Sequence, residues 1–126
     1  MGKILIVDKD EVFLRLLSKN IKRDYPLLQV ETCTSPVKAL ASMKEGLDLL
    51  LVDFEMPQLG GTKLLKYATE AGIDKNKIII LSSHDAEYLH EHFPMGTCLA
   101  VMNKYDINQK AVLEMIFKSL QRKAAG

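Results

Sequence analysis

The chain has 126 residues and a mass of 14.2 kDa, the length of one ordinary domain. Its residues are 48% apolar and 26% charged, which is enough to build a core without a metal or a disulfide. The net charge of +1 argues against a general nucleic-acid or membrane-surface binder, because such a protein carries an excess of basic residues. No apolar run approaches the ~20 residues of a membrane span, and none fits a signal peptide, so we expect a cytoplasmic protein.

Two strands and two helices are predicted in the first part of the chain. Residues 3–7 are apolar without strict alternation, which is typical of a strand buried on both faces. The helix that follows has apolar residues on one face: Val12, Phe13, Leu16, Leu17 and Ile21. Residues 28–33 alternate apolar with polar side chains, which indicates an edge strand. Ser35 and Pro36 open the next helix as N-cap and first-turn proline, and Gly46 closes it.

Two further strands flank a helix in the middle of the chain. Residues 48–53 and 77–81 contain continuous apolar runs, which again predict strands buried on both faces. The helix between them begins at Gly61 or Thr62 and stops at Gly72.

The last part of the chain predicts a short helix, a strand and a long helix. The short helix covers about residues 86–92 and ends before Pro94, and the strand covers residues 97–102. Asp106 and Gln109 open the last helix at the spacing of a capping box. The apolar residues of this helix repeat at Ile107, Val112, Met115, Ile116 and Leu120.

Alternating strands and helices indicate parallel strands joined by right-handed crossovers. We therefore expect a flavodoxin-like α/β fold, (βα)5, with a single five-stranded parallel sheet in the order 2-1-3-4-5 and helices on both faces. In that order Cys33 and Cys98 lie at opposite edges of the sheet, about 19 Å apart over four inter-strand steps. A disulfide needs Cα atoms within ~7 Å, so we expect two free thiols.

Polar residues stand at the carboxyl ends of the predicted strands, where ligands bind in such sheets. Asp8 follows the first strand, Asp53 ends the third, Ser82 follows the fourth and Lys104 follows the fifth. We expect these four side chains to converge in one crevice. Clustered carboxylates repel one another unless a cation lies near, and their oxygens suit Mg²⁺. A lysine can pair with a phosphate, and an aspartate carboxylate can attack a phosphoryl donor.

This pattern resembles the response-regulator receiver domain of two-component signalling, the CheY-like family, over essentially the whole chain. The resemblance rests on residues 4–8, on residues 48–53 continuing through Met56 and Pro57 to Gly61, on Leu81 and Ser82, and on Lys104. It implies one receiver domain over residues 1–126, with no effector domain in this chain.

The resemblance also implies roles for the residues of the crevice. Asp53 would be the phosphoacceptor, and Ser82 and Lys104 would contact the phosphoryl group. Asp8, Asp53 and the backbone carbonyl of Glu55 would hold Mg²⁺. The only chemical step would be transfer onto Asp53 itself, so the chain would be no other kind of enzyme.

The partners implied by the resemblance are proteins. A sensor histidine kinase or a phosphotransfer protein would supply the phosphoryl group. A downstream output protein or domain would contact the face formed by the fourth helix, the fifth strand and the fifth helix. No direct contact with nucleic acid or a membrane is implied, and we expect a monomer or a weak homodimer.

Three positions depart from the family pattern. Lys9 stands where the family has a second acid that ligates the metal, Tyr105 replaces a proline, and Val101 replaces an aromatic switch residue. The ammonium of Lys9 either sits in the metal's place beside Asp53 or turns to solvent. Asp10 either caps the first helix or replaces the missing ligand. We expect Mg²⁺ binding to be weakened.

Two other functions compete with phosphoryl acceptance. Lys9 favours a pseudo-receiver, a protein-interaction module that is never phosphorylated. A haloacid-dehalogenase-like phosphatase also uses an aspartate nucleophile after an apolar strand. That class needs a second aspartate two residues further on, where this chain has Glu55, and the chain has no room for a cap.

Overall fold

One parallel sheet forms the centre of the molecule. The computed structural model describes residues 2–43, 46–56, 59–84, 86–94 and 96–126. Its strands are β1 (Gly2–Val7), β2 (Leu28–Cys33), β3 (Leu49–Asp53), β4 (Ile78–Ser82) and β5 (Ala100–Asn103). They pair in parallel in the order β2-β1-β3-β4-β5, so the predicted fold and strand order are confirmed.

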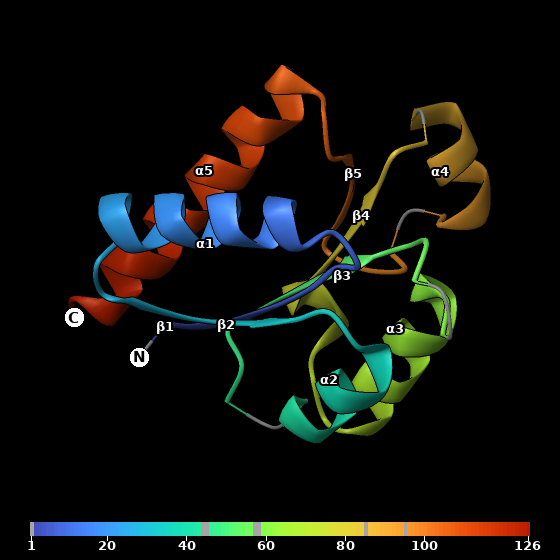
Figure 1. Cartoon of the computed structure of the whole chain (residues 1–126), viewed down its shortest axis with the longest axis horizontal. Helices are drawn as coiled ribbons and strands as arrows, with labels where there is room; N and C mark the ends of the chain where they lie inside the picture. The colour runs from blue at the N-terminus through green and yellow to red at the C-terminus, as the bar shows by residue number, and fades with distance from the viewer. Residues whose placement is uncertain (1, 44–45, 57–58, 85, 95) are drawn as a thin grey trace.

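Helices cover both faces of this sheet (Figure 1). They are α1 (Glu11–Asp24), α2 (Pro36–Ser42), α3 (Gly61–Glu70), α4 (Ala86–His92) and α5 (Ile107–Ala124), with a short 3-10 turn at Lys75–Lys77. Helices α1 and α5 pack on one face, and α2 and α3 pack on the other. Within the described residues, none of these helices has the length and hydrophobicity to cross a membrane.

The core has two layers, one on each face of the sheet. Successive side chains of a strand point to opposite faces, so Leu5 and Val7 of β1 pack with α2 and α3. Ile4 and Ile6 of the same strand pack with α1 and α5. Since full burial of an aliphatic side chain contributes about 1.5–3 kcal/mol, a strand that is buried on both sides is stabilised by apolar residues on both of its faces. This is why the central strands do not alternate.

The apolar face predicted for α1 is only partly the buried one. Ile21 is buried, and Phe13 and Leu17 pack partly buried against the core, as expected. Val12 and Leu16 are more than half exposed, however, and Leu14 is buried instead. The helix has apolar residues around much of its circumference. The stripe that becomes buried is therefore decided by how the helix docks on the sheet.

The same correction applies to α5. Leu113 and Phe117 are buried, whereas Ile107, Val112 and Met115 are exposed. Ile116 and Leu120 pack partly buried against the core, so the predicted repeat combined residues of the buried face with residues of an exposed one.

The predicted helix boundaries are mostly confirmed. The Ser35 hydroxyl accepts a hydrogen bond from the Lys38 amide (3.3 Å), as an N-cap does. Helix α2 ends at Ser42, however, and not at Gly46, which has a φ of 99° beyond the helix end. Asp106 caps α5, and the side chain of Gln109 lies outside the described residues.

The two cysteines are free, as predicted. Cys33 ends β2 and Cys98 precedes β5, and these strands are the opposite edges of the sheet. Both side chains are partly buried. The strand order therefore keeps the two thiols apart.

Candidate functional site

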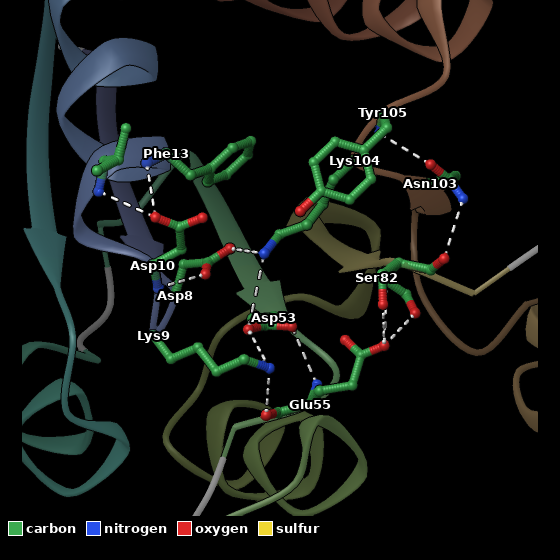
Figure 2. A network of polar contacts seen from close by, with 12 residues as sticks. Asp8, Lys9, Asp10, Phe13, Asp53, Glu55, Ser82, Asn103, Lys104 and Tyr105 are labelled. Atoms are coloured by element: carbon green, nitrogen blue, oxygen red, sulfur yellow. Dashed lines mark hydrogen bonds and ion pairs between the residues drawn. The ribbon is translucent and has the colours of Figure 1, made fainter.

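The carboxyl edge of the sheet brings together the polar residues that follow separate strands (Figure 2). Parallel pairing places the end of β1 beside the end of β3, and β4 beside β5. Asp8, Asp53 and Ser82 are fully buried at this edge. Lys104 follows β5 and reaches into the same pocket. The predicted convergence of these four residues is therefore present.

Lys104 forms a buried ion pair in this pocket. Its ammonium lies 2.6 Å from Asp8 Oδ2 and 3.8 Å from Asp53 Oδ2, and only 5% of its side chain is exposed. The ammonium also lies 4.8 Å from the centre of the Phe13 ring, a cation–π contact. Burial by itself lowers the pKa of Lys104, but the two carboxylates outweigh it and raise the pKa above its usual value. The lysine therefore stays charged.

Asp53 presents one oxygen that has no hydrogen bond. Its Oδ1 accepts a hydrogen bond from the Glu55 amide (3.0 Å). Its Oδ2 is buried and accepts none from the described residues, although it lies 3.6 Å from Lys9 Nζ and 3.8 Å from Lys104 Nζ. Burial, aided by the carboxyl groups of Glu55 and Asp8, raises the pKa of Asp53 to about 6. The free oxygen thus lies between two cations.

Lys9 points into the pocket rather than away from it. Its ammonium donates a hydrogen bond to the Glu55 carbonyl (2.9 Å) and lies 3.6 Å from Asp53 Oδ2. Of the two orientations left open by the sequence, the structure has the one beside Asp53. About half of the side chain remains exposed, so Lys9 lies on the solvent side of the pocket.

The residues present do not fit a divalent cation at this place. Mg²⁺ prefers oxygen ligands, and Lys9 already occupies the Glu55 carbonyl and lies beside Asp53 Oδ2. Asp10 is engaged elsewhere, because its Oδ1 accepts hydrogen bonds from the first amides of α1 as the N-cap. In the described part of the chain, no three His, Cys, Asp or Glu residues are grouped to hold a metal.

The Glu55 side chain has a role that the sequence did not suggest. Its Oε1 accepts hydrogen bonds from Ser82 Oγ (2.8 Å), Ser83 Oγ (3.2 Å) and the Ser83 amide (3.3 Å). It also lies 3.3 Å from His84 Nε2. The resemblance implies a role only for the backbone carbonyl of Glu55. The position of Glu55, two residues beyond Asp53 and opposite the end of β4, was the available signal.

Hydrogen bonds keep the Glu55 carboxylate ionised. Burial by itself raises the pKa of Glu55, but the interaction with the neighbouring carboxyl group of Asp53 and the hydrogen bonds donated by Ser82 and Ser83 outweigh it and hold the pKa below its usual value. The Ser82 hydroxyl that binds Glu55 also accepts a hydrogen bond from the His84 amide (3.0 Å). The loop between β4 and α4 is thus tied to the loop after β3.

Aromatic rings continue from this loop along α4. His84 stacks on Tyr88 with ring centres 4.0 Å apart, and Tyr88 stacks on His92 at 4.2 Å. Phe54, between Asp53 and Glu55, contacts these rings edge-on. Val101 is partly buried and packs against the core. The side chain of Tyr105 is 70% exposed and therefore lies largely in solvent.

Comparison with known proteins identifies the family. A family model described as "Response regulator receiver domain" matches residues 4–116. The chain belongs to the response-regulator receiver domain family of two-component signalling. This confirms the resemblance inferred from the sequence.

The receiver has curated relatives in a plant. It is 27% identical over 125 residues to the two-component response regulator ARR10 of Arabidopsis thaliana, covering 97% of this chain and 22% of that protein. It is 29% identical over 86 residues to ARR11 of the same plant, covering 68% of this chain and 16% of that protein. The chain thus spans about a fifth or less of the length of these relatives.

Solved structures share the fold of the receiver. A response regulator receiver domain protein from Clostridium thermocellum superposes with a TM-score of 0.77 at 20% identity, over 98% of this chain and 96% of that chain. The response regulator TrrA from Thermotoga maritima, solved in complex with Mg(2+)-BeF, superposes with a TM-score of 0.75 at 21% identity, over 95% of this chain and 99% of that chain.

Replacing the buried aspartate, Asp53→Asn, is expected to stabilise the receiver at neutral pH. A folded pKa of about 6, against 3.8 for an ordinary aspartate, means that the folded protein retains a proton that the unfolded chain has lost. The bound proton therefore adds its full contribution to the stability of the folded state below pH ~4, and this contribution is lost as the pH rises through 6. Two pKa units correspond to about 2.7 kcal/mol. In the variant, Lys9 and Lys104 lose a negatively charged partner, which offsets part of this amount. We therefore expect the free energy of unfolding to increase by roughly 1–2 kcal/mol at pH 7.5.

Urea denaturation of the wild type and of Asp53→Asn at pH 4.5 and pH 7.5 measures this effect. The stabilisation should be larger at pH 7.5 than at pH 4.5. The exposed carboxylate of Glu70 on α3 supplies the control Glu70→Gln, for which no such difference is expected. The same gain at both pH values would contradict the prediction.

Proposed function

We propose that this receiver accepts a phosphoryl group on the carboxylate of Asp53 from a sensor histidine kinase or a phosphotransfer protein. The observation that supports this proposal is Asp53 Oδ2, which is buried, accepts no hydrogen bond from the described residues and lies between Lys9 and Lys104. A carboxylate oxygen in this state is available as a nucleophile. Positive charge on either side stabilises the transferring phosphoryl oxygens.

The transfer exchanges one bond to phosphorus for another. Asp53 Oδ2 attacks the phosphorus of a phosphohistidine, the bond from phosphorus to the imidazole nitrogen breaks, and an acyl phosphate forms on Asp53. Lys104 pairs with one phosphoryl oxygen, and the Ser82 hydroxyl donates a hydrogen bond to another. Since the nucleophile must be ionised, the transfer requires a pH above the raised pKa of about 6. No other enzymatic activity is proposed.

Residues 1–126 would act as one receiver domain in the cytoplasm. The signal would leave through the face of α4, β5 and α5, where Tyr105, Ile107 and Met115 are exposed. These side chains offer apolar surface to an output protein or domain. Exposed apolar groups that gather on one face are typical of protein interaction sites.

Intact-mass spectrometry tests the transfer. The protein is incubated with phosphoramidate or acetyl phosphate, with and without Mg²⁺, at pH 7.5. We expect the wild type to gain the mass of one phosphoryl group and Asp53→Asn to gain none. If the wild type gains no mass with either donor, both with and without Mg²⁺, the proposal is overturned.

A second candidate function, the pseudo-receiver, is favoured by one observation. The ammonium of Lys9 already satisfies the Glu55 carbonyl and lies beside Asp53, so the pocket is balanced without a phosphoryl group. In this case the domain would bind its partner without being phosphorylated. An absence of phosphorylation in the mass experiment would favour this candidate.

A further inference from the structure

Three hydrogen-bond donors and one imidazole nitrogen converge on a single carboxylate oxygen beside the pocket. Around Glu55 Oε1 lie the hydroxyls of Ser82 and Ser83 and the Ser83 amide, at 2.8 to 3.3 Å, and His84 Nε2 at 3.3 Å. Figure 2 shows Glu55 reaching from the loop after β3 to Ser82 at the end of β4. Two hydroxyls, an amide and an imidazole form a binding site for an oxyanion, and a carboxylate occupies it.

We infer that Ser82, Ser83 and His84 form a phosphoryl-binding site, and that Glu55 occupies it as an internal ligand until a phosphoryl group displaces it. This inference deepens the proposed function and rests on it for the source of the phosphoryl group. It assigns Ser83 and His84 as donors in addition to Ser82. It also assigns Glu55 as a competitor of the phosphoryl group.

The competition follows from the number of protons available. The Ser82 hydroxyl has a single proton, which it donates to Glu55, while its oxygen accepts from the His84 amide. Ser82 can donate to a phosphoryl oxygen only after it releases Glu55. A carboxylate and a phosphoryl dianion that bind the same donors also repel each other, because both are negatively charged. The two anions therefore cannot share the site.

Displacement of Glu55 would be transmitted to α4. The ring of His84 loses one anionic partner and gains another in a new position, and this ring is stacked on Tyr88, which is stacked on His92. Phe54 is adjacent to Glu55 in sequence and contacts the same rings. A change at the pocket mouth thus acts directly on the helix expected to contact the output partner.

Hydrogen exchange without any phosphodonor tests the internal contact. Wild type is compared with Glu55→Ala, with the isosteric Glu55→Gln and with Glu70→Ala, which removes a carboxylate from the exposed surface of α3. We expect amides of residues 82–92 to exchange several-fold faster in Glu55→Ala, less so in Glu55→Gln, and unchanged in Glu70→Ala. Unchanged exchange in Glu55→Ala would overturn the inference.

Titration with inorganic phosphate, followed by NMR at the Ser83 amide and the His84 ring, tests the site itself. Removing a unit charge at ~5 Å in an effective dielectric of about 20 should tighten phosphate binding at least about tenfold in Glu55→Ala. Adding His84→Phe to that variant keeps a ring against Tyr88 but removes the donor, so part of the gain should be lost. Equal phosphate affinity in wild type and Glu55→Ala would overturn the inference.

The two proposals can fail separately. If Glu55→Ala binds phosphate more tightly but neither protein gains mass from phosphoramidate, the proposed function fails and this inference is supported. If wild type gains mass while exchange and phosphate affinity do not respond to Glu55→Ala, the proposed function is supported and this inference fails.

Discussion

Replacing Lys9 by aspartate is expected to strengthen Mg²⁺ binding at least about thirtyfold, with faster phosphorylation of Asp53 from small donors. The Lys9 ammonium lies 2.9 Å from the Glu55 carbonyl and 3.6 Å from Asp53 Oδ2, two oxygens that a hard cation would otherwise bind. A change of two charge units at ~5 Å in an effective dielectric of about 20 amounts to several kcal/mol. Screening and side-chain escape reduce this, and ~2 kcal/mol still corresponds to roughly thirtyfold.

The variant Lys9→Ala separates the two parts of this effect. It removes the positive charge without supplying a carboxylate, so its Mg²⁺ affinity should lie between those of the wild type and Lys9→Asp. Calorimetric titration of all three proteins with Mg²⁺ measures the order. Lys118→Asp, with the same charge change on the exposed surface of α5, should leave the affinity within a few-fold of wild type. Equal affinities of the three proteins would mean that Lys9 turns to solvent.

Replacing Lys104 by methionine is expected to destabilise the receiver by about 3 kcal/mol. The ammonium of Lys104 pairs with Asp8 at 2.6 Å and lies 3.8 Å from Asp53, and both carboxylates are fully buried. Without Lys104 the two negative charges face each other with only the half-exposed Lys9 nearby. Removal of one partner of a buried ion pair leaves an uncompensated charge, which is more costly than the loss of the attraction itself.

A double-mutant cycle checks the origin of this loss. Asp8→Asn in the Lys104→Met background removes the uncompensated charge and should recover at least about 1 kcal/mol, as measured by urea denaturation at pH 7.5. Lys110→Met, which changes an exposed lysine on α5, should alter stability by less than about 0.5 kcal/mol. Additive effects of the two pocket substitutions would show that Asp8 and Lys104 do not depend on each other.

The fold and the place of the pocket could both be predicted from the amino-acid sequence. Continuous apolar runs can be buried only between two layers of helices, and the alternating run of β2 can lie only at an edge. With parallel strands and this order, Asp8, Asp53, Ser82 and Lys104 must meet at one edge of the sheet. Each of these conclusions follows from the periodicity of a single segment and from rules of chain connection.

The directions of the long, flexible side chains could not be predicted from the sequence. Lys9 meets a carbonyl 46 residues away, and Glu55 meets a hydroxyl 27 residues away. Whether such contacts form depends on distances between separate loops, which no local pattern contains. The predicted apolar faces of α1 and α5 included exposed residues beside the buried ones for a related reason. Both helices have apolar residues on more than one side, and the buried side is chosen by the fit of the whole helix against the sheet.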